Sequence, residues 1–158
     1  VFDKLLGGGS IFDLGCYPLS FLMLFAKDPK KIIIKSKKLD YAKSNVDNDA
    51  RADLDCDNKF KAKIHVSIKD NLDNICIIRG SKGSIKISEP WKPGVNSTIE
   101  VTNNKHFYVK SVSSKLSVYA NQIENVSESF LDPSKKSNLF DIEKSLINMK
   151  LMSNWLNN

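Results

Sequence analysis

One short stretch of the sequence, GGGSIFDLGCYPLS at 7–20, combines residues that could carry out proton chemistry. Asp13 and Tyr17 stand four positions apart, so on a helix they share one face and can point into one pocket. A phenol with a pKa of about 10 can act as general acid or base when a nearby cation lowers that value, while the carboxylate orients the substrate. The pair therefore suits proton transfer at a hydroxyl or carbonyl group.

The same stretch also has a purely structural explanation. Ser10 follows three glycines and is a suitable N-cap for a helix. Asp13 would then help to cap that helix, and Tyr17 would lie at the edge of its apolar face. From the spacing alone, this structural explanation is the stronger of the two.

An acidic cluster further along the chain superficially resembles a calcium-binding loop. Its members are Asp47, Asp49, Asp53, Asp55 and Asp57. Counted from Asp53, the positions that need Gly and Glu in such a loop hold Asn58 and Ile64. The alternation of these acids with apolar residues instead predicts the solvent face of a strand.

The remaining candidates favour structural roles. His65 is out of phase with its apolar neighbours and His106 lies beside a turn, so we expect both at the surface. Gly80-Ser81-Lys82-Gly83 lacks the spacing of a phosphate-binding loop and predicts a hairpin turn. The three cysteines contain no C-x-x-C pair and lie near neither histidine, so we expect no metal site.

Composition excludes several classes of protein. The net charge of +6 comes almost entirely from scattered lysines, since only Arg51 and Arg79 are arginines, and we expect a solvated surface without a nucleic-acid partner. The longest apolar run, at 18–26, is too short to cross a bilayer, so we expect no membrane partner. The cysteine pattern fits a reducing cytoplasm.

Hydrophobic periodicity predicts the elements that must position these residues. We expect a helix from Ser10 to about Ala26, which Pro18 either kinks or restarts. A period of two then predicts strands at 32–35, 50–57, 60–68, 75–79, 84–88, about 98–102 and about 106–112. Helical spacing returns at about 116–131 and 139–156. This order predicts an α+β fold, with an open, mainly antiparallel sheet and helices packed on one face.

Four segments, taken together, resemble the Gfo/Idh/MocA oxidoreductases. GGGSIFDLGCYPLSFLMLF at 7–25 is similar to the family's GGG-x-x-x-D-x-G-x-[HY] segment, and IIRGSKGSIKISEPWKPG at 77–94 to its strand and turn ending in Pro-Trp. VYANQIENVSESF at 118–130 and DIEKSLINMKLMSNW at 141–155 resemble two helices that follow in the family. Four segments in the right order are far more specific than any one of them.

The resemblance implies a role for each matching residue. Asp13 and Tyr17 match the substrate-site acid and the proton-transfer residue, and Tyr17 resembles the branch of glucose–fructose oxidoreductase and dihydrodiol dehydrogenase. In such enzymes NAD or NADP takes a hydride from a substrate carbon while the Tyr or His handles the hydroxyl proton. Gly7, Gly8 and Gly9 would let the backbone approach substrate or cofactor closely. The family also implies a homo-oligomer formed through the polar face of the open sheet.

The nucleotide-binding half of such an enzyme is missing from this sequence. It contains no G-x-G-x-x-G after a strand and no EKP-like lysine motif, so we expect the Rossmann domain to lie before Val1. We therefore predict that residues 1–158 form the C-terminal substrate-binding and dimerisation domain of an NAD(P)-dependent oxidoreductase of a sugar, polyol or related compound. This piece should be inactive alone. The alternatives are a non-catalytic binding or oligomerisation module with the same fold, and a basic nucleic-acid binder.

Overall fold

The chain folds into two compact units. The structure, a computed structural model, describes residues 1–103, 105–132 and 141–157. The first unit contains Val1–Leu72 and Phe140–Asn158, and the second contains Asp73–Leu139. Asp13, Tyr17 and the three leading glycines all belong to the first unit, so that unit is the one that positions the predicted site.

A three-stranded antiparallel sheet forms one layer of the first unit. It consists of β1 (Ile32–Tyr41), β2 (Asp47–Cys56) and β3 (Phe60–Ser67), in that order. The predicted hairpin between β2 and β3 turns through Asp57 and Asn58, which both have positive φ, a conformation that Asp and Asn tolerate better than most residues. The register pairs Ala52 with Ile64, so small and branched apolar residues share the face that forms the core.

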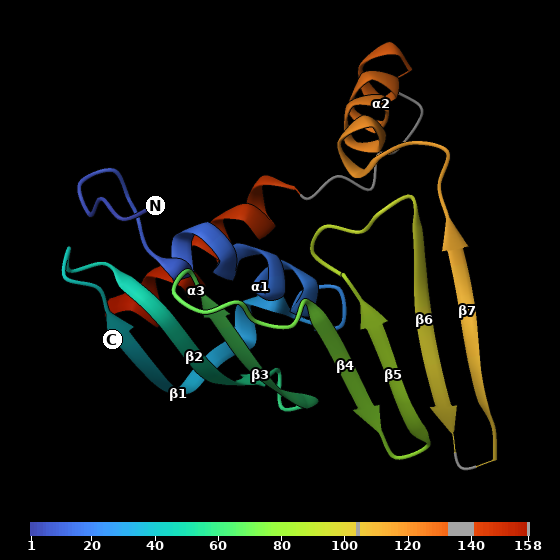
Figure 1. The fold of residues 1–158 in the computed structure, drawn as a ribbon, viewed down its shortest axis with the longest axis horizontal. Helices are drawn as coiled ribbons and strands as arrows, with labels where there is room; N and C mark the ends of the chain where they lie inside the picture. The colour runs from blue at the N-terminus through green and yellow to red at the C-terminus, as the bar shows by residue number, and fades with distance from the viewer. Residues whose placement is uncertain (104, 133–140, 158) are drawn as a thin grey trace. The chain divides into compact units, whose positions relative to one another are not determined.

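Helices from both ends of the chain cover one face of this sheet (Figure 1). The N-terminal helix begins as a π-helical turn, η1 (Ile11–Gly15), and continues as α1 (Cys16–Leu22). Pro18 lies in the first turn of α1, where a missing N–H is tolerated, so the helix restarts there. A one-turn helix, η2 (Pro29–Lys31), precedes β1. The C-terminal helix α3 (Ile142–Asn157) begins after residues 139–140, which were predicted to be helical but lie outside the described residues.

The core of the first unit lies between these two layers. Trp155 is fully buried, and its indole N–H donates to the carbonyl of Arg51 on β2 at 3.2 Å. The buried apolar residues of this core are Ile11, Leu19, Met23, Ile32, Ala50, Ala52, Leu54, Cys56, Ile64, Val66, Leu151, Met152 and Trp155. Because they come from the N-terminal helix, the sheet and the C-terminal helix, the two ends of the first unit stabilise one another.

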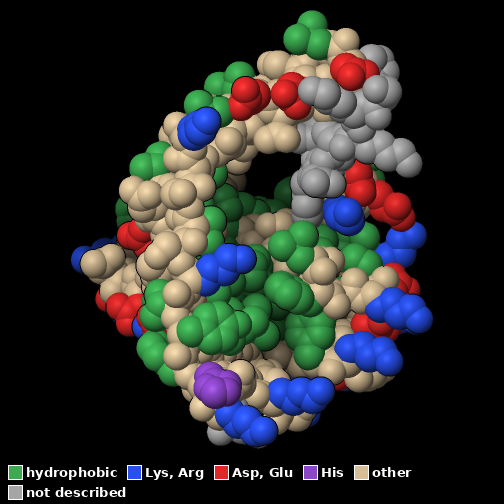
Figure 2. All heavy atoms as spheres, turned by 90° about the vertical axis from the view of Figure 1, so that its right-hand side faces the viewer, with side chains coloured by type: hydrophobic (Ala, Val, Ile, Leu, Met, Phe, Trp, Pro, Cys, Tyr) green, Lys and Arg blue, Asp and Glu red, His purple; other side chains and the backbone are tan. Residues whose placement is uncertain are grey.

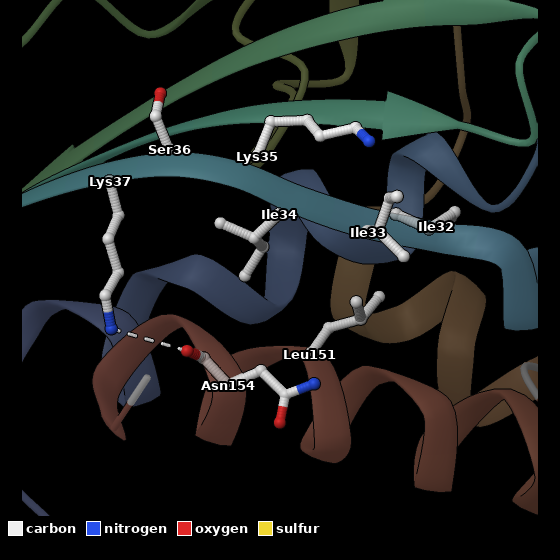
Figure 3. A pocket seen from close by; sticks show the side chains of 8 residues that line it. All are labelled: Ile32, Ile33, Ile34, Lys35, Ser36, Lys37, Leu151 and Asn154. Atoms are coloured by element: carbon white, nitrogen blue, oxygen red, sulfur yellow. Dashed lines mark hydrogen bonds between the residues drawn. The ribbon is translucent and has the colours of Figure 1, made fainter.

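The edge strand β1 is fastened to the end of α3. Lys37 reaches across a groove between the two elements and donates to the carbonyl of Asn154 at 3.5 Å (Figure 3). The same ammonium group donates to the carbonyl of Trp155 at 2.9 Å. A cation at a helix C-terminus satisfies free carbonyl groups and interacts favourably with the helix dipole. A shift in the β1–β2 register between Ile34 and Ser36 also makes β1 irregular at its middle.

The second unit is an antiparallel sheet followed by one helix. The strands β4 (Ile75–Gly80), β5 (Gly83–Ser88), β6 (Asn96–Asn103) and β7 (Phe107–Ser113) lie in sequence order. The predicted turn at 80–83 is present, and Gly83 must be glycine because a Cβ there would overlap the carbonyl of Thr102. The helix α2 (Val118–Leu131) is capped by the Ser117 hydroxyl, which accepts from the N–H of Ala120.

Much apolar surface of the second unit is exposed. Figure 2 shows hydrophobic side chains gathered on the side of the molecule that carries β7, with Lys and Arg side chains along the edge. Exposed apolar residues of this unit include Ile77, Phe107, Val109, Ile123 and Phe130. Patches of this kind mark surfaces that associate with other chains or domains.

The predicted fold class is confirmed. The described strands are antiparallel, their sheets are open, and the first unit has its helices on one face, as an α+β fold requires. The strands form two sheets, however, where the sequence predicted one continuous sheet. Among the described residues, no helix has both the length and the apolar character that a membrane span needs.

Candidate functional site

Asp13 and Tyr17 both lie on the exposed side of the N-terminal helix. Asp13 belongs to η1 and Tyr17 to α1, and the Tyr17 residue is 48% exposed. Within the described residues, neither the Asp13 carboxylate nor the Tyr17 hydroxyl makes a hydrogen bond or ion pair. Asp13 therefore does not cap the helix, and both polar groups are available to a ligand.

A buried carboxylate, Asp47, fixes the start of this helix. Asp47 is 1% exposed, and its Oδ2 accepts from the Ser10 hydroxyl at 2.7 Å and from the N–H of Ile11 at 2.8 Å. The carboxylate thus satisfies a free N–H group at the positive end of the helix. Ser10 stands at the N-cap position, as predicted, but its hydroxyl donates to Asp47 and accepts from no backbone N–H of the helix.

The buried position of Asp47 could not be predicted from the sequence, because its hydrogen-bond partners lie far away along the chain. Asp47 was predicted to belong to the solvent face of a strand together with the other acids. That prediction is wrong for Asp47 and also for Asp49, which is 4% exposed. Asp47 opens β2, and its hydroxyl partner stands 37 positions earlier in the chain. Alternation within a strand carries no signal of such a contact.

Close contacts leave no room for a Cβ at Gly8 or Gly9, and Gly7 has a φ of +70°, which favours glycine. The N–H groups of Gly7, Gly8 and Gly9 donate to carbonyl groups of the N-terminal loop at 3.2, 2.8 and 2.9 Å. Gly9 has a φ of +125°, and a Cβ there would overlap the Asp47 carboxylate. Gly9 therefore allows the close approach of the chain to Asp47. Whether these glycines also approach a substrate or cofactor, as the sequence led us to expect, stays a prediction.

Two contacts with α3 hold the middle of the segment. A Cβ on Gly15 would lie 3.2 Å from the ring of Trp155, so the helix packs closely against that indole. The side-chain N–H of Asn148 donates to the carbonyl of Cys16 at 3.0 Å. The backbone that carries Asp13 and Tyr17 is thus fixed from the sheet and from α3, while the two side chains point away from the core.

A second polar group of residues lies on the opposite face of the same sheet. The Nε2 of His65 lies 2.7 Å from the Oδ2 of Asp49, and an Nη of Arg51 lies 3.5 Å from its Oδ1. Burial raises the pKa of Asp49, but the interactions with His65, Arg51 and Ser67 lower it more, so the net pKa lies below the usual value. His65 is exposed, as predicted, and serves as a partner of a structural carboxylate. His106 is also exposed, as predicted.

The cysteines are poor candidates for nucleophiles. Burial raises the pKa of the Cys16 thiol and raises the pKa of Cys56 to about 11. Both groups are therefore protonated near neutral pH, whereas reactive cysteines need the thiolate. In the part of the chain that the structure describes, no three His, Cys, Asp or Glu side chains are grouped so that they could hold a metal ion.

Two hollows of the first unit lie away from the Asp13–Tyr17 pair. The groove between β1 and α3 has a volume of about 240 Å³ and is lined by Leu151 and Asn154 among others. The other hollow, of about 410 Å³, lies over the outer face of the sheet beside Arg51 and His65. Neither of these hollows is lined by Asp13 or Tyr17.

Comparison with known proteins identifies related chains. The sequence matches the family described as GFO/IDH/MocA C-terminal domain over residues 1–86. A trans-1,2-dihydrobenzene-1,2-diol dehydrogenase from Xenopus tropicalis is 30% identical over 92 residues, which are 58% of this chain and 28% of that protein. The chain therefore spans less than a third of this curated relative.

Solved structures share the fold. A lysine mutant of KijD10, a 3-ketoreductase from Actinomadura kijaniata in complex with TDP-benzene and NADP, matches with a TM-score of 0.80 and 18% identity over 94% of this chain and 47% of that chain. KijD10 with NADP and TDP-benzene matches with a TM-score of 0.74 and 18% identity over 92% and 43% of the two chains. At this identity the likeness concerns the fold, and this chain spans about half of those reductases.

The first prediction concerns Asp47. Asp47→Ala should lower the free energy of unfolding by at least about 2 kcal/mol, because the buried Ser10 hydroxyl and the Ile11 N–H lose their acceptor. Asp53→Ala, on the solvent side of the same strand, should change it by only about 0.5 kcal/mol. Urea unfolding followed by circular dichroism measures both. Equal losses in the two variants would contradict the anchoring role of Asp47.

The second prediction concerns acid stability. The folded pKa of Asp49 lies below an unfolded value of about 3.9, so its interactions stabilise the fold above that pH and are lost as the pH falls through the folded pKa. Asn in place of Asp49 cannot titrate, so Asp49→Asn should show a smaller decline of stability on acidification than the unmodified chain. Urea unfolding at a series of pH values tests this, with Asp53→Asn as the control. An acid decline unchanged by Asp49→Asn would refute it.

Proposed function

The chain belongs to the Gfo/Idh/MocA family, because residues 1–86 match the C-terminal domain of that family. On that premise we propose that the chain is the substrate-binding half of an NAD(P)-dependent oxidoreductase. The proposed reaction interconverts a CH–OH group and a carbonyl of a sugar, polyol or related compound. KijD10 is a 3-ketoreductase solved with NADP, and the Xenopus relative is a dihydrodiol dehydrogenase, so both relatives act in redox chemistry.

The observation that carries the proposal is that Asp13 and Tyr17 are exposed and unpaired among the described residues while their backbone is held in place. Both side chains are exposed and lack internal partners among the described residues, yet their backbone is held by Asp47 from one side and Asn148 from the other. A rigid backbone that presents unpaired polar groups is what a substrate site requires.

The proposed roles follow from the chemistry of the two groups. Tyr17 would give a proton to, or take one from, the reacting oxygen, and Asp13 would orient the substrate hydroxyl or tune that proton. Within the described residues no cation pairs with Tyr17, so the positive group that eases phenol ionisation has to come from outside these residues. We propose that a lysine of the nucleotide-binding domain supplies it.

The nicotinamide cofactor finds no phosphate-binding loop in this chain. The sequence has no G-x-G-x-x-G, and the turn at Gly80–Gly83 closes a β-hairpin and precedes no helix. We propose that NAD or NADP is held mainly by a separate Rossmann domain. When bound, the cofactor would exchange a hydride with the substrate carbon.

The third prediction concerns Tyr17. In the longer protein that includes a nucleotide-binding domain, Tyr17→Phe should lower kcat at least about tenfold to a hundredfold, because the phenol proton is lost while the ring is kept. Tyr41→Phe, an exposed tyrosine at the end of β1, should leave kcat near its original value. Initial rates of NAD(P)H oxidation with keto sugars measure both. Turnover by Tyr17→Phe at the level of Tyr41→Phe would sink the catalytic assignment and favour a non-catalytic module.

We further propose that the chain forms a homo-oligomer through one face of the β4–β7 sheet. On this face Ile77, Lys86, Glu100 and Val109 form a row across the four strands. The central Lys86 and Glu100 pair at 2.9 Å, while the flanking Ile77 and Val109 are exposed. Exposed apolar side chains beside a satisfied ion pair offer a surface that a second copy of the chain can cover.

The fourth prediction tests this face. Val109→Lys should shift the sedimentation of the chain toward the monomer, because it places a charge in the proposed interface. Val112→Lys is the matched control, since Val112 is exposed on the opposite face of the same strand. A chain that already sediments as a monomer, or a control that dissociates equally, would refute this interface.

A further inference from the structure

Asn148 is a buried polar residue with an unusual set of partners. It lies in the middle of α3 and is 6% exposed. Its Nδ2 donates to the carbonyl of Cys16 at 3.0 Å, across 132 positions of sequence. Its Oδ1 is also buried and has no hydrogen-bond partner among the described residues. Only one half of this amide is therefore satisfied.

Packing alone does not explain an asparagine at this position. Leu151, Met152 and Trp155 on the same helix fill the core with apolar side chains. An apolar side chain at position 148 would avoid the cost of a buried carbonyl oxygen without a partner. Among the described residues, the bond to the Cys16 carbonyl is the hydrogen bond that the Asn148 side chain makes, so this bond accounts for an asparagine at position 148.

The carbonyl that Asn148 holds belongs to the peptide bond between Cys16 and Tyr17. Tyr17 has no partner for its hydroxyl among the described residues, so its position depends on its backbone and on the first turn of α1. Asp47 holds the chain at Ser10 and Ile11, six or more positions before Tyr17. The Ser20 hydroxyl of the same helix donates to the carbonyl of Tyr17 at 2.8 Å, whereas Asn148 holds the neighbouring carbonyl from another helix, α3.

We propose that Asn148 is a positioning residue that sets the orientation of Tyr17 through the Cys16 carbonyl. The catalytic part of this inference rests on the proposed role of Tyr17. The positional part does not, because it concerns the contact between α3 and the start of α1 and can be measured without turnover.

The test follows Tyr17 by NMR in the full 158-residue chain labelled with ¹³C on its four tyrosine rings. Tyr17→Phe assigns the Tyr17 signal. Asn148→Ala removes the donor and should shift that signal, while the signals of Tyr108 and Tyr119 in the second unit stay in place. Asn154→Ala on the same helix is the matched control, since no side-chain hydrogen bond of Asn154 is made among the described residues.

A second variant distinguishes a hydrogen-bond donor from a filler of space. Asn148→Asp keeps the shape, and its ionised carboxylate cannot donate to the Cys16 carbonyl, whereas the protonated acid can. Because burial raises the pKa of a carboxyl, the Tyr17 signal should move away from its original position at about pH 8 and return at about pH 5.

The outcomes separate the alternatives. A Tyr17 signal that is unmoved in Asn148→Ala, or that ignores pH in Asn148→Asp, overturns the proposal. Failure of both variants to fold at either pH also overturns it, in favour of a purely structural role. In the longer protein, Asn148→Ala should lower kcat about tenfold with KM little changed, as expected for misplacement of a reacting group. If the unmodified longer protein shows no turnover, the proposed function fails while the NMR result still decides the positional role.

Discussion

The Asp47 carboxylate is the interaction on which the arrangement of the first unit depends. It joins the opening residue of β2 to the first turn of the N-terminal helix through Ser10 and Ile11. The same carboxylate leaves no room for a Cβ at Gly9, so the glycine and the acid require each other. A buried acid is tolerated here because hydroxyl and backbone N–H donors replace the water it has lost. The helix that carries Asp13 and Tyr17 takes its place on the sheet from this contact.

The sequence predicted the elements well where the signal was local. Alternation located the β2–β3 hairpin and the turn at Gly80–Gly83, and Pro18 marked the restart of the helix. The pair Asp13 and Tyr17 could be found because four-residue spacing on a helix is also a local property. The burial of Asp47 and Asp49 could not be predicted, since in a strand pattern they are indistinguishable from the solvent-facing Asp53. Their burial depends on residues brought close by the fold.

The candidate site combines exposed polar residues with buried polar residues that hold the backbone. Asp13 and Tyr17 are exposed and unpaired among the described residues, as binding groups must be before a ligand arrives. Asp47 and Asn148 are buried and hold the backbone beneath them. The buried contacts of Asp47 and Asn148 thus hold the backbone that carries Asp13 and Tyr17, while the Asp13 and Tyr17 side chains make no such contacts among the described residues. Such a division allows the ligand-facing side chains to differ between relatives while the supporting contacts stay the same.

The contact between Asn148 and the Cys16 carbonyl has a consequence for the synthesis of the protein. A ribosome releases the N-terminal helix first, and Asn148 of α3 follows 132 positions after Cys16, whose carbonyl accepts its hydrogen bond. During translation the first helix and the sheet can meet through Asp47, while the apolar surface reserved for Trp155 stays open. The Cys16 carbonyl therefore gains this hydrogen bond only after α3 has left the ribosome, so a chain interrupted before α3 carries Asp13 and Tyr17 without that contact.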